Sequence, residues 1–184
     1  MKIVRDIRHS AGMRMLRRER DVARHRAGYN FHSAERVAIL YIEQGESHYR
    51  YIRDFCSTLK TQYAVKTAFM LGYIDAPLRH IPAWQQHKLE ADFYTRTDLN
   101  WHMKPGAAVR AFMQHQFQII IDFTDGKCIP NNYLIRSNRA AMKIGPRGGL
   151  SENCYDFMID MGNSFSIAEY AKQIEHYLSN PKIK

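Results

Sequence analysis

Continuous apolar runs give the first outline of this chain. Val37–Ile42 is apolar throughout and is followed by polar residues, as expected for a strand that is buried on both faces. Phe117–Phe123 contains three consecutive isoleucines, which suit a central strand of a parallel sheet. Weaker runs predict further strands at 64–73, 93–99, 142–144 and 155–161.

Apolar residues at helical spacing lie between these runs. The stretch from Ser47 to about Lys60 has apolar positions three, four and seven residues apart, which predicts an amphipathic helix. Ser166 and Glu169 form a capping box in front of a last helix. Further helices are predicted after Pro105 and around 133–135, with a long connection over 78–90.

This alternation of strands and helices predicts an α/β fold of the doubly wound, Rossmann- or flavodoxin-like type. We expect a mostly parallel sheet of five to six strands within a single domain over 32–184. A basic, helical N-terminal extension over 1–31 would precede it, outside the core. No apolar run is long enough to span a bilayer and no secretory signal is evident, so a cytoplasmic protein is expected.

Charge is concentrated in that extension. The 184-residue chain has a formal net charge of +9. Residues 1–31 contain nine basic residues and three acidic ones, a net +6, which leaves +3 for the rest of the chain. Such asymmetry indicates an anionic partner, either a nucleic acid or a membrane surface. The arginines concerned are Arg5, Arg8, Arg14, Arg17, Arg18, Arg20, Arg24 and Arg26.

The extension also has helical periodicity. Ile3, Ile7, Ala11 and Met15 recur every four residues and predict a helix with a narrow apolar stripe, which Gly12 weakens. Arginine suits bidentate phosphate contacts and stacking on bases, the contacts that arginine-rich arms make with RNA. The alternative is a solvated basic helix that packs on the domain through Ile3, Ile7 and Met15.

The second half of the chain contains five short motifs: Asp98-Leu-Asn-Trp101, Phe112-Met before Phe117-Gln-Ile-Ile-Ile, Ser137 to Gly145, Tyr155-Asp-Phe-Met-Ile159 and Tyr177-Leu178. In this order they resemble an uncharacterised bacterial family of domains of unknown function. The resemblance covers residues 36–178 and is strongest after residue 92. It implies a compact α/β fold and no assigned activity, so no catalytic residue is carried over.

Polar residues follow several predicted strands, at the edge where open α/β sheets bind ligands. Carboxylates gathered there could hold a divalent cation, although Asp and Asn are also the ordinary residues of turns and caps. Trp101 would either plug the sheet edge or offer an aromatic platform to a ligand. The residues of this predicted pocket are Asp98, Asn100, Trp101, Asp122, Asp125 and Arg147.

Familiar catalytic and phosphate-binding signatures are absent. There is no G-x-G-x-x-G after the first strand and no Walker loop. The loop Gly145–Gly149 could accept a phosphate through its backbone and Arg147, but a flexible turn is the simpler interpretation. Cys128 is the one thiol at a helix entrance, and a buried structural cysteine is again simpler. We therefore predict no catalytic residue, no cofactor and no metal site.

Three hypotheses follow. The leading one is a non-catalytic RNA-associated protein, with ribosomal particles as one setting, that binds through the arginines of the extension. The first alternative is a metal-dependent, phosphate-handling enzyme that uses the strand-end carboxylates. The second alternative is a peripheral protein of anionic membrane surfaces.

Overall fold

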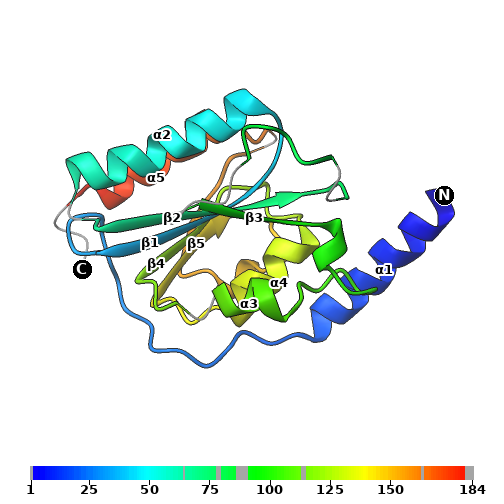
Figure 1. Ribbon diagram of the computed structural model, residues 1–184. Helices are drawn as coiled ribbons and strands as arrows, with labels where there is room; N and C mark the ends of the chain where they lie inside the picture. The colour runs from blue at the N-terminus through cyan, green and yellow to red at the C-terminus, as the bar shows by residue number, and fades with distance from the viewer. Residues whose placement is uncertain are drawn as a thin grey trace.

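The protein has one six-stranded sheet at its centre (Figure 1). The computed structural model describes residues 2–63, 65–77, 80–85, 91–112, 115–162 and 164–180. All neighbouring strands pair in parallel, in the order β3-β2-β1-β4-β5-β6. This is the strand order of doubly wound dinucleotide-binding folds, and it confirms the predicted class. The strands are β1 (Arg36–Ile42), β2 (Thr67–Ile74), β3 (Ala91–Thr95), β4 (Ile119–Asp122), β5 (Met142–Pro146) and β6 (Phe157–Ile159).

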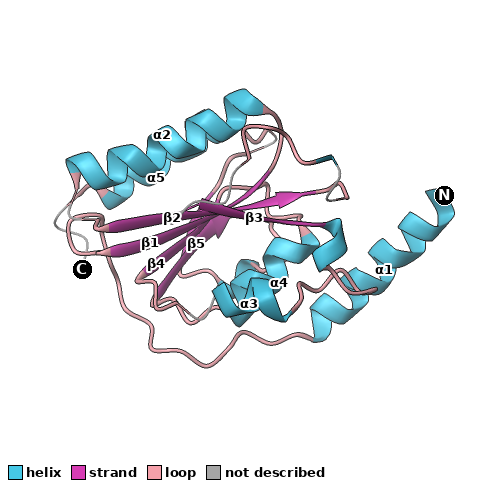
Figure 2. Cartoon of the chain, in the orientation of Figure 1, coloured by secondary structure: helices cyan, strands magenta, loops and turns pink. Residues whose placement is uncertain are grey.

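Helices cover both faces of this sheet (Figures 1 and 2). α2 (Glu46–Gln62) and α5 (Ile167–Leu178) lie on one face. α1 (Lys2–Arg18), α3 (Ala107–Phe112) and α4 (Ile129–Ser137) lie on the other.

Side chains of the central strand alternate between the two layers. Ile39 and Tyr41 of β1 pack in the core under α2 and α5, whereas Ala38 and Leu40 pack in the core under α4. A strand with both faces covered must be apolar at every position, which explains the continuous run in the sequence.

Two predicted boundaries shift for identifiable reasons. The strand expected over 93–99 ends at Thr95, because the Asp98 carboxylate accepts hydrogen bonds from Thr95 N and Oγ1 and caps a 3₁₀ turn. The helix expected to start at Ser47 starts at Glu46, after Gly45 with φ of 114°. Of the predicted long connection over 78–90, only 80–85 is described.

The N-terminal segment is helical over α1, as predicted, but its second half is not separate from the core. Residues 19–31 run along the α/β body (Figure 1) and are tied to it by backbone hydrogen bonds from Val22 to Arg136 and from Ala27 to Ala141. Phe31 is fully buried in the core under α2 and α5. The predicted separation of 1–31 from the core is therefore wrong for this stretch. Among the described residues, no helix has the length and apolar content to cross a membrane.

Candidate nucleic-acid interface

α1 contacts the body through its C-terminal half. Leu16 is 1% exposed and packs against Ile129 and Tyr133 of α4. At Gly12 the helix approaches the turn after residue 100 so closely that a Cβ would come within 3.0 Å of the carbonyl oxygen of His102. Gly12 weakens an isolated helix, but here it permits the contact that seats α1 on the body.

The apolar stripe expected to pack on the body does so only at its C-terminal end, where Met15 is partly buried against Leu16 and the residues of α4. Ile3 is 74% exposed and Ile7 is 56% exposed, because the N-terminal half of α1 projects beyond the α/β body (Figure 1). Leu16, outside the predicted stripe, is the buried residue. The interpretation of α1 as a helix packed through Ile3, Ile7 and Met15 is therefore wrong for Ile3 and Ile7 and holds for Met15.

The arginines of α1 remain largely accessible. Arg5, Arg14, Arg17, Arg18 and the following Arg20 are all exposed. Arg14 and Arg18 are each two positions from Leu16, which places them on the side of the helix turned away from the body. α1 therefore presents a basic face to solvent.

Arg8 joins α1 to a turn that displays an aromatic side chain. Its guanidinium donates to the carbonyl oxygens of Asn100 at 2.9 Å and of Trp101 at 3.3 Å. The turn is held from within, because Asn100 Oδ1 accepts hydrogen bonds from the backbone N–H groups of His102 and Lys104. Trp101 itself is 54% exposed and does not plug the edge of the sheet.

A cavity of about 1090 Å³ lies between α1 and the ends of β2 and β3. Arg5, Arg8 and His9 line it from α1, and Arg96 and Trp101 line it from the body. Asp75 also lines it and accepts a hydrogen bond from Arg96 Nε at 3.0 Å. The structure therefore brings together two sets of residues predicted separately, the arginines of the extension and Trp101.

Arg24 differs from the other arginines of the segment. Its side chain is 1% exposed and pairs with Asp156 at 2.8 Å. It also donates to the carbonyl oxygens of Ala140, Ala141 and Cys154. Arg24 is thus enclosed by the fold and is not available to a partner.

Arg26 is 57% exposed and lies 3.4 Å from both Asp21 and Asp156, so two carboxylates offset its charge.

The predicted pocket at the carboxyl ends of the strands is not assembled. Asp98 follows β3 and Arg147 follows β5, four strand intervals apart, or about 19 Å at the usual strand spacing. Arg147 instead lies 3.4 Å from Asp160. Asp125 is exposed and accepts a hydrogen bond from Lys127 N. The prediction that these residues share one pocket is therefore wrong.

Asp122 is fully buried and serves the interior. It accepts hydrogen bonds from Tyr155 Oη at 2.7 Å and Thr124 Oγ1 at 2.8 Å. Burial raises the pKa of this carboxyl to about 6, although both hydrogen bonds oppose the shift. Burial also raises the pKa of the Cys128 thiol, opposite to what a reactive cysteine needs. Across the described ranges, no three His, Cys, Asp or Glu side chains gather as metal ligands would.

One buried ion pair was not predicted from the sequence. Lys143 of β5 is fully buried, and its Nζ lies 2.6 Å from Asp21 Oδ1 in the N-terminal segment. Burial lowers the pKa of Lys143, and Asp21 opposes that shift. The signal available in the sequence was a lysine within the apolar run of a predicted strand, because a buried ammonium group needs a carboxylate partner.

Comparisons with known proteins leave the activity open. No curated protein matches the chain. A solved structure, the E. coli heptosyltransferase WaaC with ADP, is similar at 13% identity and a TM-score of 0.44. The similarity covers 77% of this chain and 46% of that one, so the chain spans about half of its length. A family model described as a family of unknown function (DUF6913) matches residues 12–180, from within α1 to the end of α5. That match confirms the predicted resemblance, and the chain belongs to this family of unknown function.

Proposed function

We propose that this protein binds RNA, free or within a ribonucleoprotein particle, through the surface formed by α1 and the turn around Trp101. The observation that carries the proposal is the contact of Arg8 with the carbonyl groups of Asn100 and Trp101. This contact holds an exposed tryptophan beside a helix with exposed arginines. Aromatic side chains stack on the bases of unpaired RNA, and arginines bind its phosphates.

The two components of this surface would act differently. Arg14, Arg17 and Arg18 on the solvent side of α1 would neutralise phosphates, independently of sequence. Trp101 would stack on an unpaired base, and Arg5 in the adjoining cavity would contact the phosphate beside it. Arg24 has no part in the proposal, because its guanidinium is already bound within the fold.

The salt dependence of RNA binding tests the phosphate contacts. For the whole chain and a labelled single-stranded RNA, log affinity should fall linearly with log salt, by about 0.7 for each phosphate contacted. Replacing Arg14, Arg17 and Arg18 together by Gln should therefore reduce the slope by about 2. The matched control is the double variant Arg50→Gln and Arg53→Gln on α2, across the sheet, which should leave the slope unchanged. RNA binding without salt dependence, or an unchanged slope in the triple variant, would overturn the proposal.

An anionic membrane surface is a second candidate, and one observation favours it. Ile3, Val4 and Ile7 are 74%, 55% and 56% exposed on the same helix as the arginines. Apolar and basic side chains together are typical of helices that lie in a lipid interface. No Trp or Phe occurs in residues 1–28, so insertion would be shallow.

Two variants separate the candidates. Replacing Ile3 and Ile7 together by Ser should abolish flotation with vesicles that contain anionic lipid while leaving RNA affinity unchanged, if the helix binds membranes. Replacing Trp101 by Ala should weaken RNA binding and leave flotation unchanged. Flotation of the wild-type protein without measurable RNA affinity would favour the membrane candidate.

A further inference from the structure

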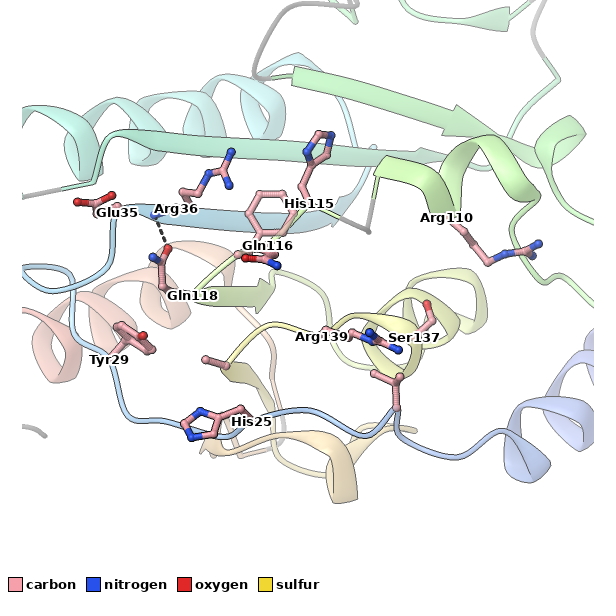
Figure 3. A pocket seen from close by; sticks show the side chains of 13 residues that line it. His25, Tyr29, Glu35, Arg36, Arg110, His115, Gln116, Gln118, Ser137 and Arg139 are labelled. Atoms are coloured by element: carbon pink, nitrogen blue, oxygen red, sulfur yellow. Dashed lines mark hydrogen bonds between the residues drawn. The ribbon is translucent and has the colours of Figure 1, made fainter.

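A second cavity, of about 960 Å³, opens at the amino ends of β1, β4 and β5, the end of the sheet opposite to the predicted pocket (Figure 3). Arg36 is the first residue of β1, Gln118 precedes β4 and Ala141 precedes β5, and all three line it. The N-terminal segment contributes His25 to its other side. The cavity thus lies between the body and the segment that the buried Lys143–Asp21 pair holds in place.

The lining is strongly cationic. Three arginines, Arg36, Arg110 and Arg139, reach it from β1, from α3 and from the residues after α4 (Figure 3). His25 and His115 also line it. The lining includes one carboxylate, Glu35, whose Oε1 lies 2.7 Å from Lys66 Nζ and is thus already paired.

Two of these arginines have no partner among the described residues. Within the part of the chain that the structure describes, no hydrogen bond or ion pair engages the guanidinium of Arg36 or of Arg139. Arg110 donates to the carbonyl oxygen of Pro105, which leaves other N–H groups of its guanidinium unused. Positive charge collected around a concave surface attracts anions, because the field is focused there.

Neutral polar groups complete the lining. Gln116, Gln118, Ser137 and Tyr29 offer amide and hydroxyl groups. Gln118 is held in place, since its side-chain oxygen accepts a hydrogen bond from Arg36 N at 2.8 Å (Figure 3). The volume is that of an ordinary small-molecule site, but a lining of this polarity does not suit an apolar ligand.

We infer that this cavity binds a small molecule with two or more linked phosphate groups, held by Arg36, Arg110 and Arg139. Three guanidinium groups suit a ligand with several phosphate oxygens, since each can bind phosphate oxygens in a bidentate manner. The enclosure between the N-terminal segment and α3 favours a compact anion over a long nucleic acid strand. The inference is independent of RNA binding, which uses the solvent face of α1.

Calorimetric titration of the whole protein with inorganic pyrophosphate tests the inference. Pyrophosphate should bind in a one-to-one ratio and at least ten-fold more tightly than orthophosphate, because it offers the three guanidinium groups more negative charge and more phosphate oxygens. Arg139→Gln and, separately, Arg36→Gln should each weaken pyrophosphate binding by about ten-fold or more, the usual loss for a charge-assisted hydrogen bond. Both side chains are on exposed residues, so both variants should fold.

Two control variants keep the result interpretable. Arg53→Gln on α2 should not change the affinity for pyrophosphate. The triple variant of Arg14, Arg17 and Arg18 should retain pyrophosphate binding whether or not it binds RNA. Absence of pyrophosphate binding, or equal losses in the triple variant and in Arg139→Gln, would overturn the inference.

Discussion

The two halves of the N-terminal segment contain the same residue type in opposite roles. In α1, Arg14, Arg17 and Arg18 point to solvent. A few residues later, Arg24 is 1% exposed and bridges Asp156 and three backbone carbonyl groups of the body. The basic character of this segment therefore has two separate causes. One half is available to a partner, and the other half attaches the segment to the fold.

What distinguishes the halves is the presence of carboxylates. Asp21 lies beside Arg24, and Asp156 approaches from the start of β6. Lys143 adds a third cation to this cluster from the interior of the sheet. A charge can be buried only where opposite charges and carbonyl groups replace its water. The exposed arginines of α1 have no such set among the residues that the structure describes, so they stay hydrated.

The sharpest test of this comparison is the same substitution made at Arg24 and at Arg14. Arg24→Met should lower the free energy of unfolding by about 3–5 kcal/mol, because it removes a buried guanidinium that pairs with Asp156 and donates to three backbone carbonyl groups. Arg14→Met should change it by no more than about 0.5 kcal/mol. Urea unfolding measures both, and similar values for the two variants would contradict the division of roles.

The apolar residues of α1 show the same contrast. Leu16→Ala should cost about 2–5 kcal/mol, because it opens a cavity against Ile129 and Tyr133. Ile7→Ala should cost less than about 0.5 kcal/mol, because Ile7 is already 56% exposed. Thermal unfolding of the two variants in parallel decides which residue seats the helix. A larger effect at Ile7 would favour the packing predicted from the stripe.

The buried carboxyl of Asp122 makes the stability of the fold depend on pH. A folded-state pKa of about 6 lies above the unfolded value of 3.8, so the folded state favours the protonated form. The contribution of Asp122 to the free energy of unfolding is fully present below pH 3.8 and is lost as the pH rises to about 6. The loss is on the order of 3 kcal/mol, from the free energy that corresponds to each pKa unit.

The variant Asp122→Asn tests this contribution, since it replaces the titrating carboxyl by a neutral amide of similar size. Urea unfolding across the range should show the free-energy difference between wild type and variant changing by that amount and then levelling off above pH 6. A difference that does not vary with pH would mean that Asp122 keeps an ordinary pKa.

The smallest expected effect concerns Trp101. Trp101→Ala should weaken single-stranded RNA binding by about 1–3 kcal/mol, the usual value of one base stacked on an aromatic ring. Trp101→Phe should retain most of the affinity. The matched control is Trp84→Phe, because Trp84 donates to Glu43 on the opposite layer of the fold. Equal affinities of wild type and Trp101→Ala would remove Trp101 from the interface.

The local sequence was enough to predict the helices and strands of the fold. Val37–Ile42 and the isoleucines of β4 are apolar at every position because helices cover both faces of their sheet. Ser166 does accept a hydrogen bond from Glu169 N at the start of α5. The candidate site was only partly accessible in this way. Its arginines and Trp101 could be named from the sequence, whereas their proximity depends on Arg8 reaching the carbonyl group of Asn100, 92 positions along the chain.

The sequence alone thus determined which segments form strands and helices, and that positive charge is concentrated near the N-terminus. Both follow from neighbouring residues, through periodicity and composition. The tertiary structure decided which arginines remain free, which apolar side of α1 is buried, and that strand-end carboxylates lie apart while three arginines surround one cavity. These features depend on pairs such as Lys143 and Asp21, 122 positions apart, which meet only because the N-terminal segment runs along the folded body.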